Sequence, residues 1–393
     1  MVAHVACALA GLGLVLLGVL HLAQWRLLRR RGTTAAADLP PVSILKPLKG
    51  VDEDLEENLH SFFALDYPEV ELVFGVDDPA DPALVVARRV AAAHPGVPTR
   101  FVASGRRVGR NAKVNNLANI LQHARHGVIL ISDSNTAVRP DALRGMVSRL
   151  LEPGVGLVTS PIRGVAARGL GGRLESLQLN SFVMGGVAAV SLLSRHVATV
   201  GKSMLMRRTD LERIGGFPEL SRYLAEDQVC GEAMRAHGLG VVLTAEPVDN
   251  VLGPVRTTSF AARHLRWARI RRRMHAGAYT AEVLANPVAP ALLGLAVDPS
   301  ALTVGVLGAT LTLLSALDLA AERRLGVRRS PLHYPALELL RGVLLAALWP
   351  VAFLSSTVSW RGTTYRIGDR TLLVPLEEPP WSEGEELPGE AAA

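Results

Sequence analysis

The first 24 residues constrain this chain most. Residues 2–24 are apolar apart from His4, His21 and Gln24, and about 20 such residues cross the hydrocarbon core of a bilayer. Four arginines follow between positions 26 and 31, and the positive-inside rule places that end in the cytoplasm. Because the basic residues follow the apolar run, the pattern argues against a cleaved signal peptide. We therefore expect residues 1–25 to form a retained transmembrane anchor.

The composition fits a membrane-attached enzyme. Of the 393 residues, 49% are hydrophobic and only 20% are charged, and the mean hydropathy is +0.25. These values exclude a disordered chain and argue against a purely soluble cytosolic enzyme. Two cysteines, Cys7 and Cys230, cannot form a disulfide framework. The net charge of +6 fits anionic lipid or substrate, and it is too small to indicate a nucleic-acid partner.

Residues 40–255 show the pattern of an α/β domain. Strand patterns cover 42–48, 70–78, 99–104 and 126–135, and helix patterns cover 55–65, 83–94 and 113–124. This alternation predicts a mostly parallel sheet with helices on both faces. Ligands bind such sheets beyond the carboxyl ends of the strands. Two of these strands end in Asp78 and Asp133, so we expect the site at that edge.

The remainder of the chain predicts membrane contact. Residues 256–282 form a basic helix suited to a membrane surface, or else a solvated charged helix. Membrane segments follow at 283–358, of which 283–297 contains two prolines and is expected to bend or re-enter. Whether that segment crosses decides the side of the tail, 359–393, which is acidic and predicted to be disordered at its end. Residues 182–200 fit an interfacial helix or the wall of a lipid-facing groove better than a span.

Three acidic positions are candidates for chemistry, and each has an ordinary structural alternative. Asp78, in the pair Asp77-Asp78, can accept hydrogen bonds from a nucleotide or can cap a turn. Asp133 can bind a hard divalent cation that keeps positions open for phosphates, or can be a turn aspartate. The Asp-x-Asp form is absent, because Asn135 occupies its third position. Asp227 can be a general base, or it can only stabilise a helix start.

Basic and aromatic candidates complete the set. Arg263 and Arg266 suit a leaving diphosphate, because the guanidinium fork binds phosphate oxygens. Trp267 suits either an acceptor or the membrane interface. Lys113, near the start of a predicted helix, suits phosphate, and residues 199–208 suit the lining of an acceptor pocket. Ordinary surface basic residues remain the alternative interpretation.

In this order, the residues resemble the ceramide glucosyltransferases of glycosyltransferase family 21, which have a GT-A fold. The family pattern of three separated aspartates and (Gln/Arg)-x-x-Arg-Trp falls on Asp78, Asp133, Asp227, Arg263, Arg266 and Trp267. The segments 42–50, 113–117, 225–227 and 360–362 match as well. The resemblance covers about four fifths of the chain.

The resemblance implies an inverting transferase that uses a UDP-sugar, usually with Mg²⁺ or Mn²⁺. It implies that Asp78 holds the nucleotide, Asp133 the metal-diphosphate, and that Asp227 is the base. Arg263, Arg266 and Trp267 would hold the diphosphate and the acceptor end, and we expect Lys113 to bind the nucleotide-sugar.

We therefore expect an integral membrane enzyme with a cytoplasmic catalytic domain, in the inner membrane if the source is bacterial. Its expected reaction moves glucose from UDP-glucose to the primary hydroxyl of ceramide or a similar sphingolipid in the membrane. One alternative is a UDP-N-acetylglucosamine-dependent enzyme that acts on a hopanoid or another polyol lipid. Two further alternatives are a non-catalytic lipid-binding protein and a processive polysaccharide synthase.

Overall fold

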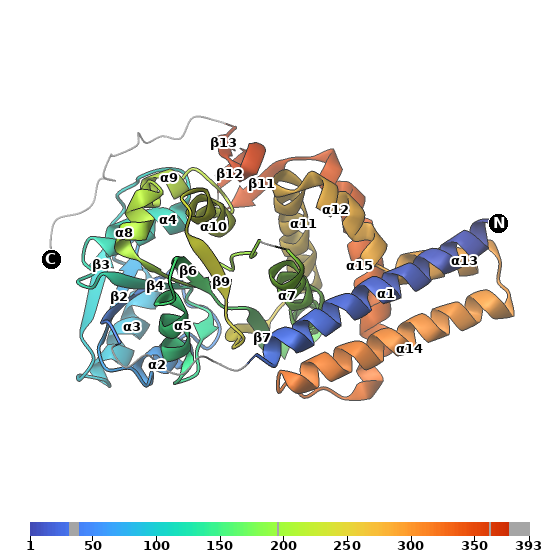
Figure 1. Cartoon of the computed structure of the whole chain (residues 1–393), viewed down its shortest axis with the longest axis horizontal. Coiled ribbons are helices and arrows are strands. Elements are labelled where there is room, and N and C mark those ends of the chain that lie inside the picture. Colours follow the sequence, from blue (N-terminus) through green and yellow to red (C-terminus); the bar gives the residue numbers. More distant parts are fainter. Residues whose placement is uncertain (31–38, 195, 361–362, 377–393) are drawn as a thin grey trace. The chain divides into compact units, whose positions relative to one another are not determined.

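The computed structural model describes residues 1–30, 39–194, 196–360 and 363–376 (Figure 1). The chain forms two compact units. The first consists of Met1–Arg29, Arg163–Ser194 and Leu252–Val358, and the second of Arg30–Ile162, Arg195–Val251 and Ser359–Ala393. The predicted disordered end of the tail lies outside the described residues.

A seven-stranded sheet forms the centre of the second unit, in the order β3-β2-β1-β4-β8-β6-β9. Only β8 runs antiparallel to its neighbours, β4 and β6, and the other neighbouring strands are parallel. The predicted mostly parallel sheet is thus confirmed. The strands are β1 (Val42–Pro47), β2 (Val70–Val76), β3 (Thr99–Ala103), β4 (Val128–Ser132), β6 (Val155–Thr159), β8 (Ser203–Arg207) and β9 (Gly240–Leu243).

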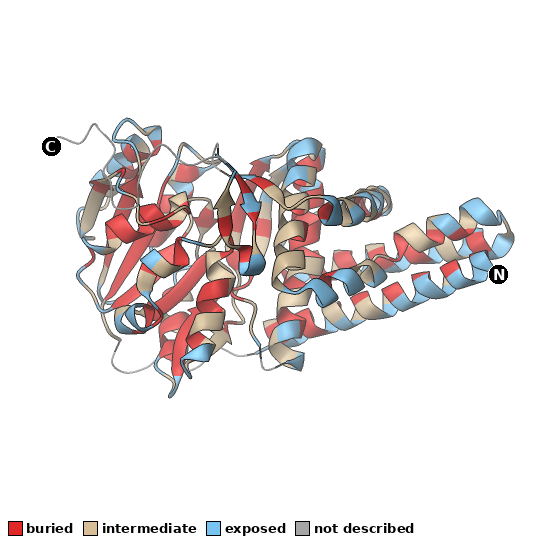
Figure 2. Ribbon diagram, turned by 90° about the horizontal axis from the view of Figure 1, so that it is seen from above, coloured by how far each residue is buried: buried red, intermediate tan, exposed pale blue. Residues whose placement is uncertain are grey.

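Helices cover both faces of this sheet, as the sequence predicts. Successive strand residues point to opposite faces, so Ile44 packs in one core cluster and Leu45 in the other. Figure 2 shows the strands as buried between the helices. The first cluster contains residues of α2 (Leu55–Phe63), α3 (Pro82–Ala92) and α5 (Ala142–Leu150). The second contains residues of α4 (Ala112–Leu121), α8 (Arg208–Arg213), α9 (Gly216–Leu220) and α10 (Glu226–Ala236).

Short strands complete the second unit. Strand β5 (Thr136–Ala137) pairs antiparallel with β10 (Val248–Pro254). Strands β12 (Thr363–Ile367) and β13 (Leu373–Pro375) form an antiparallel hairpin around the short helix η4 (Asp369–Thr371). Along the sequence, divisions between the two units fall within β10 and within two further strands, β7 (Ile162–Arg168) and β11 (Thr357–Trp360).

The first unit is helical and contains the apolar segments. Residues 163–194, which the sequence reading placed within 40–255, belong to this unit. Helix α1 lies alongside α13 and α14 (Figure 1). The helices are α1 (Val2–Leu28), α6 (Gly169–Gln178), the π-helical turn η1 (Leu179–Val183), α7 (Met184–Leu193), α11 (Thr257–Met274), α12 (Ala276–Glu282), η2 (Val283–Ala285), α13 (Val288–Val297), α14 (Ala301–Arg324), η3 (Pro331–His333) and α15 (Tyr334–Leu354).

Several of these helices are candidate membrane spans. In the part of the chain that the structure describes, four helical runs are long and apolar enough to cross a bilayer: Val2–Leu28, Gly169–Leu193, Ala301–Arg324 and Pro331–Leu354. The pair Ala276–Ala285 and Val288–Val297 bends by 56°, which confirms the bend expected in 283–297. Buried ion pairs join three helices: His21 Nε2 lies 2.7 Å from Asp318 Oδ1, and Arg341 lies 2.9 Å from Asp318 Oδ2.

Candidate active site

Asp133 lies at the centre of a cluster of lysines in the second unit. Its Oδ1 is 2.9 Å from Lys113 Nζ, and its Oδ2 is 3.1 Å from Lys202 Nζ. Lys46 Nζ donates to the main-chain oxygen of Asp133 at 2.6 Å. Three ammonium groups therefore meet one aspartate at the end of β4, which is the edge of the sheet where the sequence predicts the site.

The order of the strands explains how these groups come together. Strand β4 lies between β1 and β8. Lys46 belongs to β1, and Lys202 directly precedes β8. Lys113 comes from the first turn of α4, where Asn111 caps the helix by accepting from the backbone N–H groups of Lys113 and Val114. The neighbouring strands and one helix start thus deliver positive charge to the same point.

The sequence pattern predicted Lys113 as a binding residue but did not predict Lys46 or Lys202. The chain contains four lysines among 42 basic residues, and three of them surround Asp133. Because arginine is the usual basic residue in this chain, each of the few lysines is a candidate for a specific role. Lys46 has a second distinguishing feature in the sequence, because it interrupts an apolar strand. The structure shows that it is completely buried. Lysine is almost never buried without a partner.

Asp227 lies in the first turn of α10 and is held by two backbone donors. Its Oδ2 accepts from the N–H of Gly201 and its Oδ1 from the N–H of Gln228, both at 2.8 Å. Lys113 Nζ lies 3.0 Å from Glu226 Oε1. Lys113 therefore connects Asp133 to the Glu226–Asp227 pair, so the structure brings three of the predicted site residues into one cluster.

The β12–β13 hairpin fixes the segment that leads into α10. The N–H of Leu224 donates to the Thr371 carbonyl at 3.0 Å, and the N–H of Ala225 donates to the Thr371 hydroxyl at 3.1 Å. Thr371 has a φ of 66°, a left-handed conformation that is strained for a β-branched residue. A strained residue of the hairpin thus positions the backbone directly before Asp227.

Burial and neighbouring charges change the ionisation of these groups. Burial, and then Glu226, raises the pKa of Asp227 to about 6. Burial lowers the pKa of Lys46 to about 7. Burial alone would raise the pKa of Asp133, but Lys113 and Lys202 outweigh it and hold that pKa well below its usual range. Asp227 is therefore a stronger base than an ordinary aspartate, whereas Asp133 stays charged.

Asp78 follows β2 in an exposed turn. Its Oδ1 accepts from the N–H of Ala80 at 2.8 Å, and its main-chain oxygen accepts from the N–H of Asp81 at 3.0 Å. Local hydrogen bonds of this kind are typical of an aspartate that stabilises a turn, the alternative interpretation of Asp78. Its predicted contact with the nucleotide stays a prediction.

The basic motif lies on α11 in the first unit. Arg263 Nη1 is 3.2 Å from Glu175 Oε1, and the rings of His264 and Trp267 meet edge-on with centroids 5.3 Å apart. Burial, and then the neighbouring Arg263, lowers the pKa of Arg266. Crowded, partly desolvated guanidinium groups gain from an anionic partner.

The donor set at Asp133 fits a divalent cation that arrives with a diphosphate. Within the described ranges, no group of three or more His, Cys, Asp or Glu side chains could hold a metal ion. Asp133 supplies one carboxylate, and Asn135 supplies an amide oxygen that Lys202 now contacts. Mg²⁺ commonly binds through one or two carboxylates while substrate phosphates complete its shell. Such a cation would compete with Lys113 and Lys202 for Asp133.

The chain is similar to known glycosyltransferases. Glycosyl transferase family 21 matches residues 4–373. Ceramide glucosyltransferase 1 of Caenorhabditis elegans is 30% identical over 239 residues, covering 59% of this chain and 50% of that protein. Ceramide glucosyltransferase 3 of the same organism is 26% identical over 343 residues, covering 84% of this chain and 73% of that protein. The chain thus spans about half the length of the first relative and about three quarters of the second.

Among solved structures, a mannosyltransferase from Pyrobaculum calidifontis in complex with GDP-Man and Mn²⁺ has a similar fold. The TM-score is 0.50 at 20% identity, covering 88% of this chain and 98% of that one. That likeness supports the GT-A-type fold. The match of the family model over residues 4–373 leads to one conclusion: the chain belongs to glycosyl transferase family 21.

Proposed function

We propose that this enzyme transfers glucose from UDP-glucose to the primary hydroxyl of ceramide or a similar sphingolipid, with inversion at the anomeric carbon. The observation that carries the proposal is the bridge formed by Lys113, which joins Asp133 to the segment that holds Asp227. A diphosphate-binding group and a candidate base thus lie side by side. The names of the relatives supply the sugar and the acceptor.

In this mechanism Asp227 removes the acceptor proton. The acceptor oxygen forms a bond to the anomeric carbon, the bond from that carbon to the UDP oxygen breaks, and the proton passes to the Asp227 carboxylate. A pKa of about 6 keeps the carboxylate ionised at neutral pH and makes it more basic than an ordinary aspartate. The backbone donors of Gly201 and Gln228 hold it in one orientation.

The lysines stabilise the leaving group. UDP gains negative charge as its bond to the sugar breaks, and fixed cations aimed at that charge lower the barrier. Lys113 and Lys202 each form an ion pair with one oxygen of Asp133. Each ammonium group can also donate a hydrogen bond to a diphosphate oxygen. A bound Mg²⁺ or Mn²⁺, held by Asp133 and Asn135, would supply further positive charge there. We assign Asp78 to the nucleotide, Arg263 and Arg266 to the diphosphate, and Trp267 to the acceptor end.

The relatives favour ceramide over a polyol lipid. Both of the relatives described above are named as ceramide glucosyltransferases. A UDP-N-acetylglucosamine-dependent enzyme for a hopanoid has no support of this kind. The Mn²⁺ named with the Pyrobaculum calidifontis mannosyltransferase is the reason to include Mn²⁺ beside Mg²⁺ in the assay below.

The pairing of strands supports a membrane topology. Strands β6 and β8 are neighbours in one sheet, so the chain between them crosses a membrane an even number of times. The single helical run at 169–193 therefore lies along the membrane instead of crossing it. Leu372 forms a bridge with Tyr223, so the stretch between these two residues also crosses an even number of times.

Only two of the three candidates in that stretch can then cross. The arginine-rich loop at 322–329 favours the cytoplasmic side, as do the arginines that follow α1. Both conditions are met when α1, the bent pair at 276–297 and α14 cross, while α15 stays on the cytoplasmic side. Helix α15 runs at a steep angle to α14 (Figure 1). The hairpin at 363–375 then lies in the cytoplasm with the catalytic unit.

Cysteine labelling tests this topology. A membrane-impermeant maleimide should label Ser300→Cys in intact cells, because residue 300 joins α13 to α14. It should label Ser330→Cys and Ser355→Cys only after permeabilisation. Labelling of Ser355→Cys in intact cells would mean that α15 crosses.

A transfer assay on the purified full chain tests the reaction itself. UDP-glucose, UDP-galactose and UDP-N-acetylglucosamine are each offered with ceramide and with a hopanoid polyol, in Mg²⁺, Mn²⁺ or EDTA. The expected product is β-linked glucosylceramide, and Asp227→Asn should abolish it while UDP binding persists. A product formed only from UDP-N-acetylglucosamine and the polyol would overturn the substrate assignment.

A further inference from the structure

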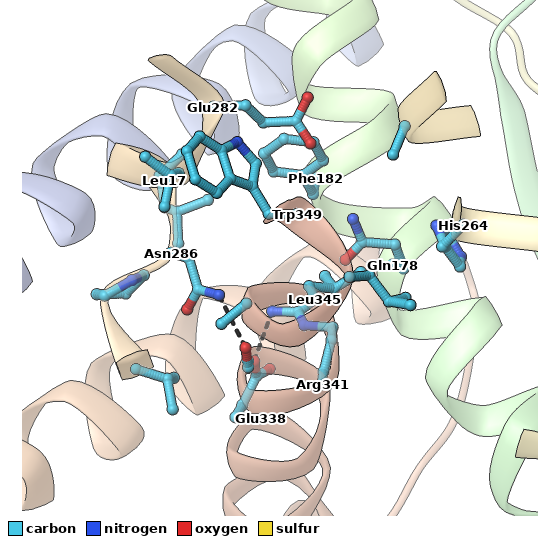
Figure 3. Close-up of a pocket in the computed structure, with 18 of the residues that line it drawn as sticks. Leu17, Gln178, Phe182, His264, Glu282, Asn286, Glu338, Arg341, Leu345 and Trp349 are labelled. Atoms are coloured by element: carbon cyan, nitrogen blue, oxygen red, sulfur yellow. Dashed lines mark hydrogen bonds and ion pairs between the residues drawn. The ribbon is translucent and has the colours of Figure 1, made fainter. Parts of the chain in front are cut away.

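A cavity lies within the first unit, walled by α1, α6 with η1, α11 and α15 (Figure 3). Its volume is about 70 Å³. A buried water needs roughly 10–15 Å³ on this measure, so the cavity holds several waters or one small polar group. Its walls combine Phe182, Leu345 and Trp349 with the polar side chains of Gln178 and His264.

Gln178 is a polar residue of this cavity whose side-chain amide lacks a partner among the described residues, and the buried Oε1 of Glu338, on the same walls, lacks a hydrogen bond as well. Its side chain points into the cavity (Figure 3) and the residue is 5% exposed. In the described part of the chain, its amide has no hydrogen-bond partner, and a buried amide without one is costly. Gln178 therefore requires a partner that the protein does not supply.

His264 adds a second polar group beside it. Its Nε2 is 3.2 Å from Glu175 Oε2, and its Nδ1 has no partner among the described residues. His264 lies on α11 within the motif that contains Arg263, Arg266 and Trp267. The cavity is thus built partly by the helix to which the mechanism assigns the diphosphate and the acceptor end.

The backbone around Gln178 is also irregular. The π-helical turn Leu179–Val183 follows it directly, and Phe182 in that turn lines the cavity. Single π-helical turns inside α-helices occur frequently at functional sites. Here the turn places Gln178 and Phe182 on the same cavity wall.

The charges of the cavity indicate the class of ligand. Arg341 Nη2 pairs with Glu338 Oε2 at 2.5 Å, and Arg271 pairs with Glu282 at 2.8 Å. These four charged side chains therefore compensate each other and leave no free cation for a phosphate headgroup. An amide and an imidazole instead suit a neutral ligand with hydroxyl and amide groups.

We propose that this cavity binds the polar head of the lipid acceptor, a neutral amide-bearing lipid whose hydrocarbon chains stay in the bilayer. Gln178 and His264 hydrogen-bond to its amide and hydroxyl groups, and Phe182 and Trp349 contact its first carbons. Candidate spans α1 and α14 contribute Leu17 and Leu314 to the same walls, and on this proposal the lipid reaches the cavity from the membrane. The proposal rests on the proposed function and names the acceptor site of that reaction.

The test uses Gln178→Met, which keeps the side-chain volume and removes the amide. In the full chain, the KM for ceramide should rise roughly fivefold to tenfold, the effect of losing one hydrogen bond, while the KM for UDP-glucose stays within about twofold. Gln122→Met is the matched control, because Gln122 is exposed on the second unit. Phe182→Trp, which fills part of the cavity, should also raise the KM for ceramide.

A binding measurement separates this proposal from the proposed function. A ceramide with a photoreactive diazirine beside its amide should label peptides that contain Phe182 or Trp349, and Gln178→Met should reduce that labelling. Thermal unfolding of each variant reports whether it is folded. Labelling of the cavity without any glucosylceramide formation would overturn the proposed function and retain the lipid site. Glucosylceramide formation with unchanged labelling and KM in Gln178→Met would overturn the lipid site alone.

Discussion

Lys113 and Asp133 form an ion pair of 2.9 Å between the start of α4 and the end of β4. The same ammonium group contacts Glu226 at 3.0 Å, one residue before the proposed base. One lysine thus sets the electrostatics of the leaving-group side and of the base side of the proposed reaction.

Replacement of this lysine should separate its two effects. We expect Lys113→Met to lower kcat/KM for UDP-glucose on the order of a hundredfold to a thousandfold, as loss of one preorganised donor does elsewhere. Since Lys113 also lowers the pKa of Asp227, the pH profile of the variant should shift upward. Lys49→Met is the control, because Lys49 is exposed. Equal losses in both variants would remove the special role of Lys113.

The ionisation of Asp227 predicts an acid limb in the pH dependence of the rate. Its pKa is raised to about 6, and only the ionised form accepts a proton. The rate should therefore be level above pH 7 and fall about tenfold per unit below pH 6. Single-turnover rates from pH 4.5 to 8.5 measure this limb. A limb near pH 4 would assign the proton transfer to an ordinary carboxylate.

Lys46 predicts proton uptake when UDP binds. Its pKa is lowered to about 7, so at pH 8 most of the side chain is neutral. A nearby diphosphate favours the charged form, and binding should then take up close to one proton. Calorimetric titration in two buffers of different ionisation enthalpy measures the number.

The variant Lys46→Met provides the comparison, because it should take up no proton at this position when UDP binds. The ammonium form of a buried lysine opposes folding once the pH falls below the unfolded pKa near 10.5, and this penalty is complete below about pH 7. Lys46→Met should therefore also unfold at a higher temperature at pH 7. The same uptake in both proteins would assign the proton to another group.

Thr371 predicts a distant effect on catalysis. Thr371→Val removes the acceptor of the Ala225 N–H and leaves a donor without its partner, a loss of about 1–3 kcal/mol. Because Ala225 precedes Glu226 and Asp227, kcat should fall about tenfold while the KM for UDP-glucose changes little. Thr364→Val, on the exposed side of the same hairpin, is the control. Equal kcat values for both variants would count against positioning of the base by Thr371.

Local patterns predicted much of the second unit. The apolar runs that became β1, β2 and β4 are short and bounded by acidic or proline residues, so their type and order could be inferred. The position of Asp133 at the edge of the sheet could be inferred from the strand ends, whereas Asp227, at a helix start, was assigned a catalytic role only through the family resemblance. The position of Lys202 beside Asp133 could not be inferred, because nothing local indicates that β8 inserts antiparallel beside β4.

Contacts between distant parts of the chain escaped prediction for the same reason. The pattern of apolar and polar residues around Thr371 does not indicate a contact with Tyr223 or Ala225, which lie about 146 residues earlier. Residues 163–194 interrupt the sheet-forming sequence, yet they group with α1 and α14. Their moderate hydrophobicity suits several environments, so composition alone did not assign them.

The hairpin formed by β12 and β13 has a consequence for how the enzyme matures. It is translated after α15, yet it holds the segment before Asp227, which is made well before α11. The strands of the sheet are therefore synthesised long before the segment ahead of the proposed base is held in place. On the proposed function, we expect the nascent chain to fold around its sheet before it can transfer sugar, and activity to begin only after the hairpin that follows α15 has been synthesised.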